Sequence, residues 1–255
     1  MIGLFFQGTG TGVKQTVMKR YVFPLFVVIL AGLVLPAVGV AQEDRVTIDQ
    51  SQVPAEGSSP EDFVPQGWKI EEQLTGDLTS DALPDFVLKL VEDKPAADKD
   101  GDATERQRAL VIVLRNGKGR LVRAGVAGRL LQCTRCGGAF YGVVESPANI
   151  KIQKGVLIVD QDHGSRDVTN TTYRFRYIPE SQKFALIGFD FSDSDRVTGG
   201  VVSESTNYLT GTRVVSRSKG KRDVNTRTVI PRKPIYIEQV DSDKFEEDAV
   251  VRLKL

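Results

Sequence analysis

The residues with the most definite chemistry lie in one short loop. Asp77, Thr79, Asp81 and Asp85 place side-chain oxygens at alternating positions between two strand-like runs, residues 68–75 and 86–91. Oxygen ligands in a loop short enough to wrap an ion are what Ca²⁺ prefers. These four residues are the predicted metal ligands, with Ca²⁺ as the cofactor. The alternative is a metal-free turn in which the aspartates accept hydrogen bonds from backbone N–H groups.

Residues 76–88, with the letters GDLTSDALPDFVL, resemble the FG-GAP/VCBS type of calcium loop of integrin-like propeller blades. The resemblance extends to exported bacterial proteins of unknown function that carry one such loop. It also covers Cys136-Gly137-Gly138 and residues 206–211 (TNYLTG). Ser80 and Ala82 replace two glycines of the loop pattern. A left-handed backbone at Ala82 would cost about 1–2 kcal/mol. The resemblance therefore implies weak calcium binding that stabilises the turn.

The two cysteines, Cys133 and Cys136, have C-x-x-C spacing. In an oxidising compartment such a pair is expected to form a disulfide. Thiol redox catalysis would need a strand before the pair and a helix after it, and two glycines follow instead. A structural zinc site needs four ligands. The two cysteines and the only histidine supply three ligands, so the fourth ligand would have to be a carboxylate or come from a second subunit.

That histidine, His163, lies next to Gly164 in a turn-like segment, and we expect it to face solvent in a loop. A serine hydrolase would need a serine held against the imidazole, and the chain has no G-x-S-x-G motif. The leading prediction is a protein without catalytic residues. The alternative is a hydrolase or thiol redox enzyme that uses His163 or the cysteine pair.

A basic segment runs from Arg213 to Lys233, with eight basic residues and one acidic residue, Asp223. It predicts contact with an envelope component or another anionic polymer. The alternative is a solvated hairpin whose charges discourage edge-to-edge pairing.

The elements that must position these residues are β-strands. Tyr173, Phe175 and Tyr177 alternate with arginines, which is the period of a strand, and they form either a binding platform or part of the core.

Asn116-Gly117 predicts a hairpin turn. Strands are expected at residues 68–75, 85–91, 108–115, 121–126, 129–133, 150–153, 156–160, 171–178, 184–191, 201–209, 212–217, 225–230 and 235–240. A short helix is the alternative only near residues 243–253. This pattern predicts an all-β fold, an antiparallel meander closing into a sandwich, an open barrel or a partial propeller.

The first 41 residues predict a secretory signal peptide, with a true start at Met18, an apolar run over residues 22–35 and cleavage before Gln42. An uncleaved membrane anchor is the alternative. Residues 42–66 are polar and contain three prolines, which predicts a flexible linker. A single β domain is expected over residues 67–255.

Charge is nearly balanced in the expected mature chain. Residues 1–41 hold three of the 34 basic residues and none of the 33 acidic ones, so 31 basic and 33 acidic residues remain. Such a balance gives no general attraction to nucleic acid. The sequence predicts an exported, periplasmic or secreted, non-enzymatic binding or envelope-associated module.

Overall fold

The computed structural model describes residues 47–219 and 222–255. All of these residues belong to one compact unit, Asp44–Leu255. The predicted signal peptide and its apolar run lie outside the described residues. Among the residues described, no helix is both long enough and apolar enough to cross a membrane.

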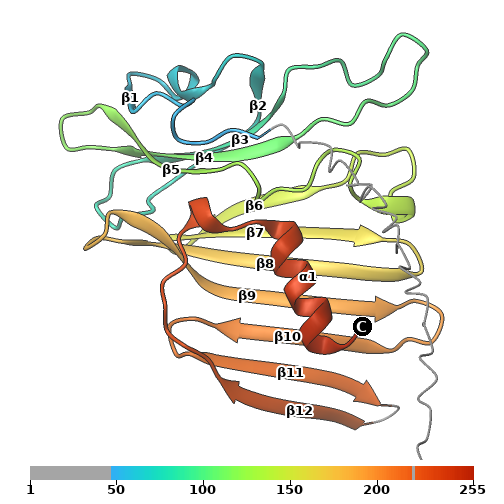
Figure 1. The fold of residues 1–255 in the computed structure, drawn as a ribbon. Helices are drawn as coiled ribbons and strands as arrows, with labels where there is room; N and C mark the ends of the chain where they lie inside the picture. The colour runs from blue at the N-terminus through green and yellow to red at the C-terminus, as the bar shows by residue number, and fades with distance from the viewer. Residues whose placement is uncertain (1–46, 220–221) are drawn as a thin grey trace, which may run out of the picture. The chain divides into compact units, whose positions relative to one another are not determined.

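Two antiparallel sheets make up the described unit, so the predicted all-β class is confirmed (Figure 1). The five-stranded sheet has the order β1-β5-β4-β3-β2, and the seven-stranded sheet has the order β12-β11-β10-β9-β8-β7-β6. The first sheet contains β1 (Glu56–Gly57), β2 (Trp68–Gly76), β3 (Asp85–Glu92), β4 (Arg108–Arg115) and β5 (Leu121–Ala127). The second contains β6 (Ala148–Gln153), β7 (Val156–Gly164), β8 (Asp167–Ile178), β9 (Lys183–Asp195), β10 (Val201–Asn207), β11 (Thr212–Lys219) and β12 (Arg222–Val229). Each sheet is mainly a meander of neighbouring strands.

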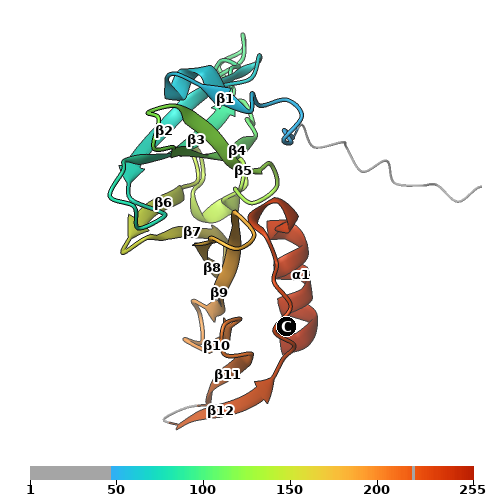
Figure 2. The ribbon, with the colours of Figure 1, turned by 90° about the vertical axis from the view of Figure 1, so that its left-hand side faces the viewer.

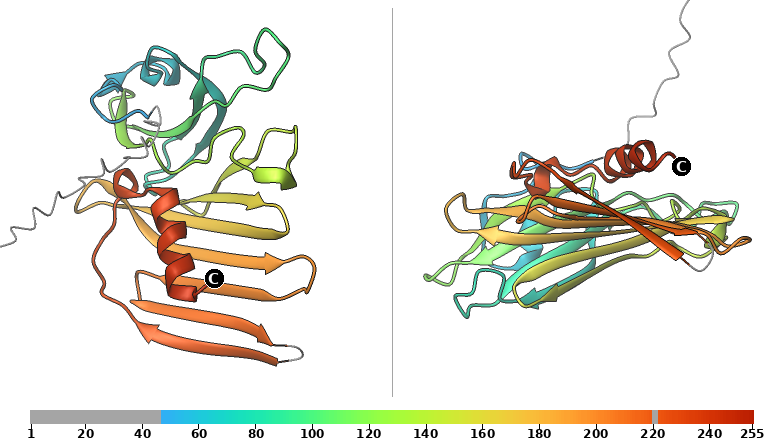
Figure 3. Two further views of the ribbon diagram at one scale, coloured as in Figure 1. Left: turned by 45° about the vertical axis from the view of Figure 1, so that its right-hand side comes forward. Right: turned by 90° about the horizontal axis from the view of Figure 1, so that it is seen from below.

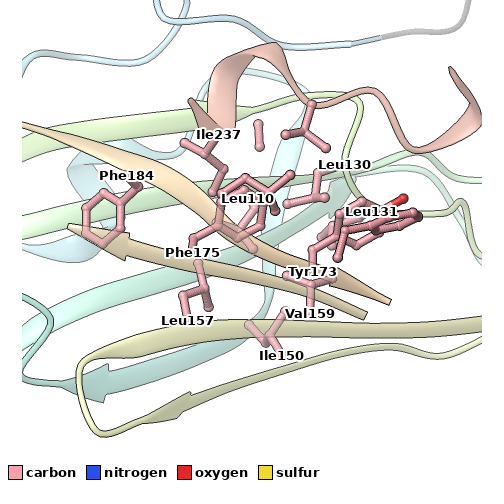
Figure 4. Packing of buried hydrophobic residues seen from close by; sticks show 14 of the residues in the cluster. Leu110, Leu130, Leu131, Ile150, Leu157, Val159, Tyr173, Phe175, Phe184 and Ile237 are labelled. Carbon is pink, nitrogen blue, oxygen red and sulfur yellow. The ribbon is translucent and has the colours of Figure 1, made fainter. Parts of the chain in front are cut away.

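The main core lies where the two sheets and the C-terminal segment meet (Figure 4). Leu110 of β4, Leu157 of β7 and Phe175 of β8 are fully buried there, and Ile237 joins them from the short 3₁₀ helix η3 (Ile237–Gln239). Tyr173 is also fully buried, with its ring centroid 5.0 Å from that of Phe189. The aromatic residues of β8 therefore belong to the core, and the binding-platform alternative is wrong for Tyr173 and Phe175.

A second core lies on the opposite face of the five-stranded sheet. Leu88, Leu90, Val111 and Val113 point into it, whereas Val87, Leu110 and Ile112 point into the main core. Because both faces are covered, β3 and β4 carry nearly continuous apolar runs rather than alternation.

The segment that covers the second core shows that the prediction of a flexible linker over residues 42–66 is wrong for its described part. Within the described part of that segment, Ile48, Val53 and Phe63 are buried in the second core. Glu56–Gly57 forms β1 beside β5, and Pro60–Phe63 forms the 3₁₀ helix η1. The polar composition misled the prediction because only a few apolar residues are needed to cover one face of a small sheet.

Two predicted strands are absent from the described structure. Residues 129–133 form an irregular segment, because the side chain of Gln161 takes the place of a partner strand: it donates to the Leu130 carbonyl (3.0 Å) and accepts from the Gln132 amide (2.6 Å). Of residues 235–240, Ile237–Gln239 form η3, and Tyr236 makes only an isolated bridge with Ala185. The Gln239 side chain accepts from the Tyr236 amide (2.9 Å) at the start of η3.

The one α-helix, α1 (Ser242–Leu253), confirms the expected short helix among the described residues. Asp241 caps its N-terminus by accepting from the amides of Asp243 and Lys244. Phe245, Ala249 and Leu253 recur every four residues and turn one face to the main core. The helix lies along one face of the seven-stranded sheet (Figures 1 and 2). β11 and β12 extend beyond it.

Candidate functional site

The predicted metal loop joins β2 to β3 and is closed by its own hydrogen bonds. The Asp77 carboxylate accepts from the amides of Thr79 (3.2 Å), Ser80 (2.6 Å), Asp81 (3.3 Å) and Ala82 (3.0 Å). These bonds lower the pKa of Asp77 against the opposing effect of burial. Three of these bonds go to Oδ1 and one goes to Oδ2, so the amides of the turn use most of the acceptor capacity of this carboxylate.

Asp85 anchors the loop to the five-stranded sheet. Its buried carboxylate accepts from the amides of Leu78 (2.9 Å) and Arg115 (3.0 Å). Burial raises its pKa, although both amides oppose that shift. Asp85 thus connects the start of β3 to the end of β4.

Ser80 and Ala82 both adopt the left-handed backbone, with φ values of 67° and 63°. These are the positions of the two pattern glycines. The loop therefore keeps the backbone shape that the resemblance implies, at a cost in strain. The described geometry is that of a capped turn, and calcium binding remains a prediction.

Cys133 and Cys136 are joined by a disulfide. An irregular segment precedes the pair, and the three-residue 3₁₀ helix η2 (Gly138–Phe140) follows it. Cys133 is buried and Cys136 is exposed. The strand and helix that would lower a thiol pKa are not beside this pair.

His163 does not lie in a loop, which corrects the prediction. It lies near the end of β7, and its side chain is 34% exposed. Its Nε2 lies 2.6 Å from Oε2 of Glu246 on α1. This hydrogen bond raises the pKa of His163, and burial opposes the shift. The strand continues past its apolar run because β7 pairs with β8 as far as Gly164.

The structure brings His163 and Cys136 to one cleft of 380 Å³, together with Gln132, Ser242 and Glu246. The Cys-Gly-Gly segment packs against the turn after His163, since the Gly164 amide donates to the Gly137 carbonyl (3.0 Å). A Cβ on Gly138 would lie 2.7 Å from the Gly164 carbonyl oxygen, and its φ is +68°. Both observations require glycine at this position.

The groups in this cleft do not form a nucleophile–base pair. His163 contacts a carboxylate, and the Ser242 hydroxyl donates to the Arg129 carbonyl (3.2 Å). A triad needs a hydroxyl or thiol aligned with the imidazole.

The basic segment is divided between internal and outward contacts. Arg213 lies 3.1 Å from buried Glu204, and Arg217 donates to the Leu253 carbonyl. Arg227, Arg232 and Lys233 are exposed. Lys221 lies outside the described residues. Only part of the predicted basic surface therefore faces outward.

Comparison of the chain with protein-family models, with curated proteins and with solved structures finds no match. The FG-GAP/VCBS resemblance therefore rests on the residues of this chain alone.

Proposed function

We propose that this chain is an exported, non-enzymatic binding module, and that its edge strand β12 takes up an extended acidic polypeptide segment of an envelope component. The observation that carries the proposal is the open edge of the seven-stranded sheet. β12 is the terminal strand of that sheet (Figure 3), and all of its described side chains, residues 223–229, are exposed. Val224 is 53% exposed and Val229 is 91% exposed.

The register identifies which amides of β12 point outward. The Ile230 amide donates to the Gly211 carbonyl (2.9 Å). Hydrogen-bonded pairs alternate with non-bonded pairs in an antiparallel ladder. Thr228 and Thr226 therefore donate inward to β11, while Asn225 and Arg227 direct their N–H groups to the open edge. An added strand would accept hydrogen bonds from these two residues.

The charge of the residues at this edge favours an acidic partner. Three exposed basic residues lie on or just after β12: Arg227, Arg232 and Lys233. The one acidic residue of the strand, Asp223, accepts from the Ser218 hydroxyl (2.8 Å). An acidic extended segment would gain main-chain hydrogen bonds as well as charge attraction, whereas an anionic polymer would gain only the second.

The experiment uses a fluorescent peptide with alternating Glu and Val residues as the probe. We expect the full chain to bind this peptide with salt-sensitive affinity. We expect weaker binding to the same peptide methylated on alternate backbone nitrogens, because methylation removes donors to the β12 edge. Asn225→Pro should also weaken binding without unfolding the sheet, since that amide points away from β11.

Controls separate edge pairing from charge alone. The double variant Arg227→Gln/Lys233→Gln should bind more weakly, whereas Lys118→Gln, in the turn of the other sheet, should bind like wild type. Equal affinity for the methylated peptide, or for a polyanion without a backbone, would refute edge pairing. Self-association that Asn225→Pro abolishes, without peptide binding, would instead identify a second copy of the chain as the occupant.

A further inference from the structure

One carboxylate lies beside the cysteine pair. A carboxylate oxygen of Glu105 and the Sγ atoms of Cys133 and Cys136 all lie within 4.8 Å of one another. Among the described residues, this is the one group of three or more His, Cys, Asp or Glu side chains with such spacing. The sequence offers no hint of this contact, because Glu105 lies 28 residues before Cys133 in a segment of high charge.

Hydrogen bonds of the backbone and of two hydroxyl groups also join the segments that carry these three residues. The Arg106 amide donates to the Thr134 hydroxyl (3.0 Å), and the Thr134 amide donates to the Arg106 carbonyl (3.0 Å). These bonds place Glu105 beside the cysteine turn. The Ser146 hydroxyl donates to the Cys133 carbonyl (2.7 Å), and the Cys136 amide donates to the same carbonyl (3.3 Å). None of these bonds involves a sulfur atom, so none is lost directly when the S–S bond is broken.

We propose that the reduced chain binds one Zn²⁺ through the thiolates of Cys133 and Cys136 and the carboxylate of Glu105. Zinc takes thiolate sulfur and carboxylate oxygen in tetrahedral sites, and a site with three protein ligands leaves the fourth position to water. Cys136 and Glu105 are exposed, so the ion and its water have access. Buried Cys133 supplies the inner ligand.

The disulfide makes this site redox-controlled. A dithiol reductant gives two electrons and two protons to the S–S bond, which yields two thiols and the disulfide of the reductant. Zn²⁺ then displaces the two thiol protons, because the thiolate is the metal ligand. The oxidised chain lacks both thiolates, so the proposal predicts metal binding only after reduction.

The test is an anaerobic titration of the full chain, reduced with a phosphine and freed of excess reductant, using Co²⁺ and Zn²⁺ as probes. We expect one ion per chain, a thiolate-to-Co²⁺ charge-transfer band and a higher melting midpoint with Zn²⁺. The oxidised chain and the reduced, alkylated chain should show none of these. Glu105→Gln should weaken Zn²⁺ binding by tenfold or more, whereas Glu180→Gln, an exposed carboxylate in another turn, should not.

The Glu105→Gln comparison also covers the case in which reduction unfolds the chain. A dithiol in an unfolded chain would bind metal without Glu105, so equal affinity of Glu105→Gln and wild type would overturn the proposal. Binding to the oxidised chain would overturn it as well. One ion shared by two chains would show that the ion bridges two copies and does not occupy the three-residue site.

Discussion

The carboxylate of Glu246 on α1 lies 2.6 Å from Nε2 of His163 near the end of β7. These residues are 83 positions apart in the sequence. The contact fixes the N-terminal half of the helix to the seven-stranded sheet, beside the buried ring of Tyr173. Two further polar contacts join α1 to this sheet: Arg252 pairs with Glu204, and Arg217 donates to the Leu253 carbonyl.

Protonation of His163 should stabilise the docked helix. The hydrogen bond to Glu246 raises the pKa of His163 above 6.5, with further support from Asp162 and Asp243. Because the folded-state pKa lies above the unfolded value, this stabilisation is complete below the unfolded pKa and is lost as pH rises through the folded pKa. Glu246→Gln should therefore lower the free energy of unfolding more at about pH 6 than at about pH 9. Urea unfolding at both pH values measures this difference.

The neighbouring variant Glu247→Gln provides the control, because Glu247 is exposed on the same turn. It removes the same charge and should show no such pH dependence. An NMR titration in which His163 keeps its pKa in Glu246→Gln would contradict the assignment.

The second contact is a buried ion network. Glu204 on β10 is 1% exposed. It lies 2.8 Å from the guanidinium of Arg252 on α1 and 3.1 Å from that of Arg213 on β11. Removing one partner of a fully buried ion pair costs about 3–5 kcal/mol, but both arginines keep some contact with water, so we expect Glu204→Ala to cost about 2–3 kcal/mol. Lys151→Ala, which breaks an exposed pair with Asp160, should cost at most about 1 kcal/mol. Chemical denaturation of both variants checks the contrast.

The acidic loop predicts how the chain responds to calcium. Because four amides occupy the Asp77 carboxylate, we expect millimolar Ca²⁺ to leave the melting midpoint of the full chain unchanged relative to chelator. A cation that binds only the folded state must raise that midpoint. A rise in wild type that disappears in Asp81→Ala would establish the calcium site that the sequence predicts.

Residues before β2 should be essential for the five-stranded sheet. Phe63 is fully buried in the second core, so Phe63→Ala should cost about 3–5 kcal/mol. A chain that starts at Gly67 would expose that face of the sheet and should bind a hydrophobic dye. Val64→Ala, at a partly buried neighbouring site, should cost clearly less. A truncated chain with native stability and no dye binding would disprove the role of this segment.

The sequence by itself determined the local features of this protein. Alternation and apolar runs located most of the strands, because the period of side chains along a strand is fixed by the backbone. The spacing of Asp77 and Asp85 marked a loop that closes on itself, and Gly-rich segments marked tight turns. These features depend on residues a few positions apart, whose interactions are the same in any fold that contains them.

Only the tertiary structure decided how these pieces meet. The pairing of His163 with Glu246, of Glu105 with the cysteines and of Phe63 with the five-stranded sheet each joins distant segments. The tertiary structure also decided how the strands divide into sheets of five and seven, and that β12 lies at an open edge. Such contacts arise from the summed burial of whole faces, and no single short segment carries enough of that free energy to reveal its partner.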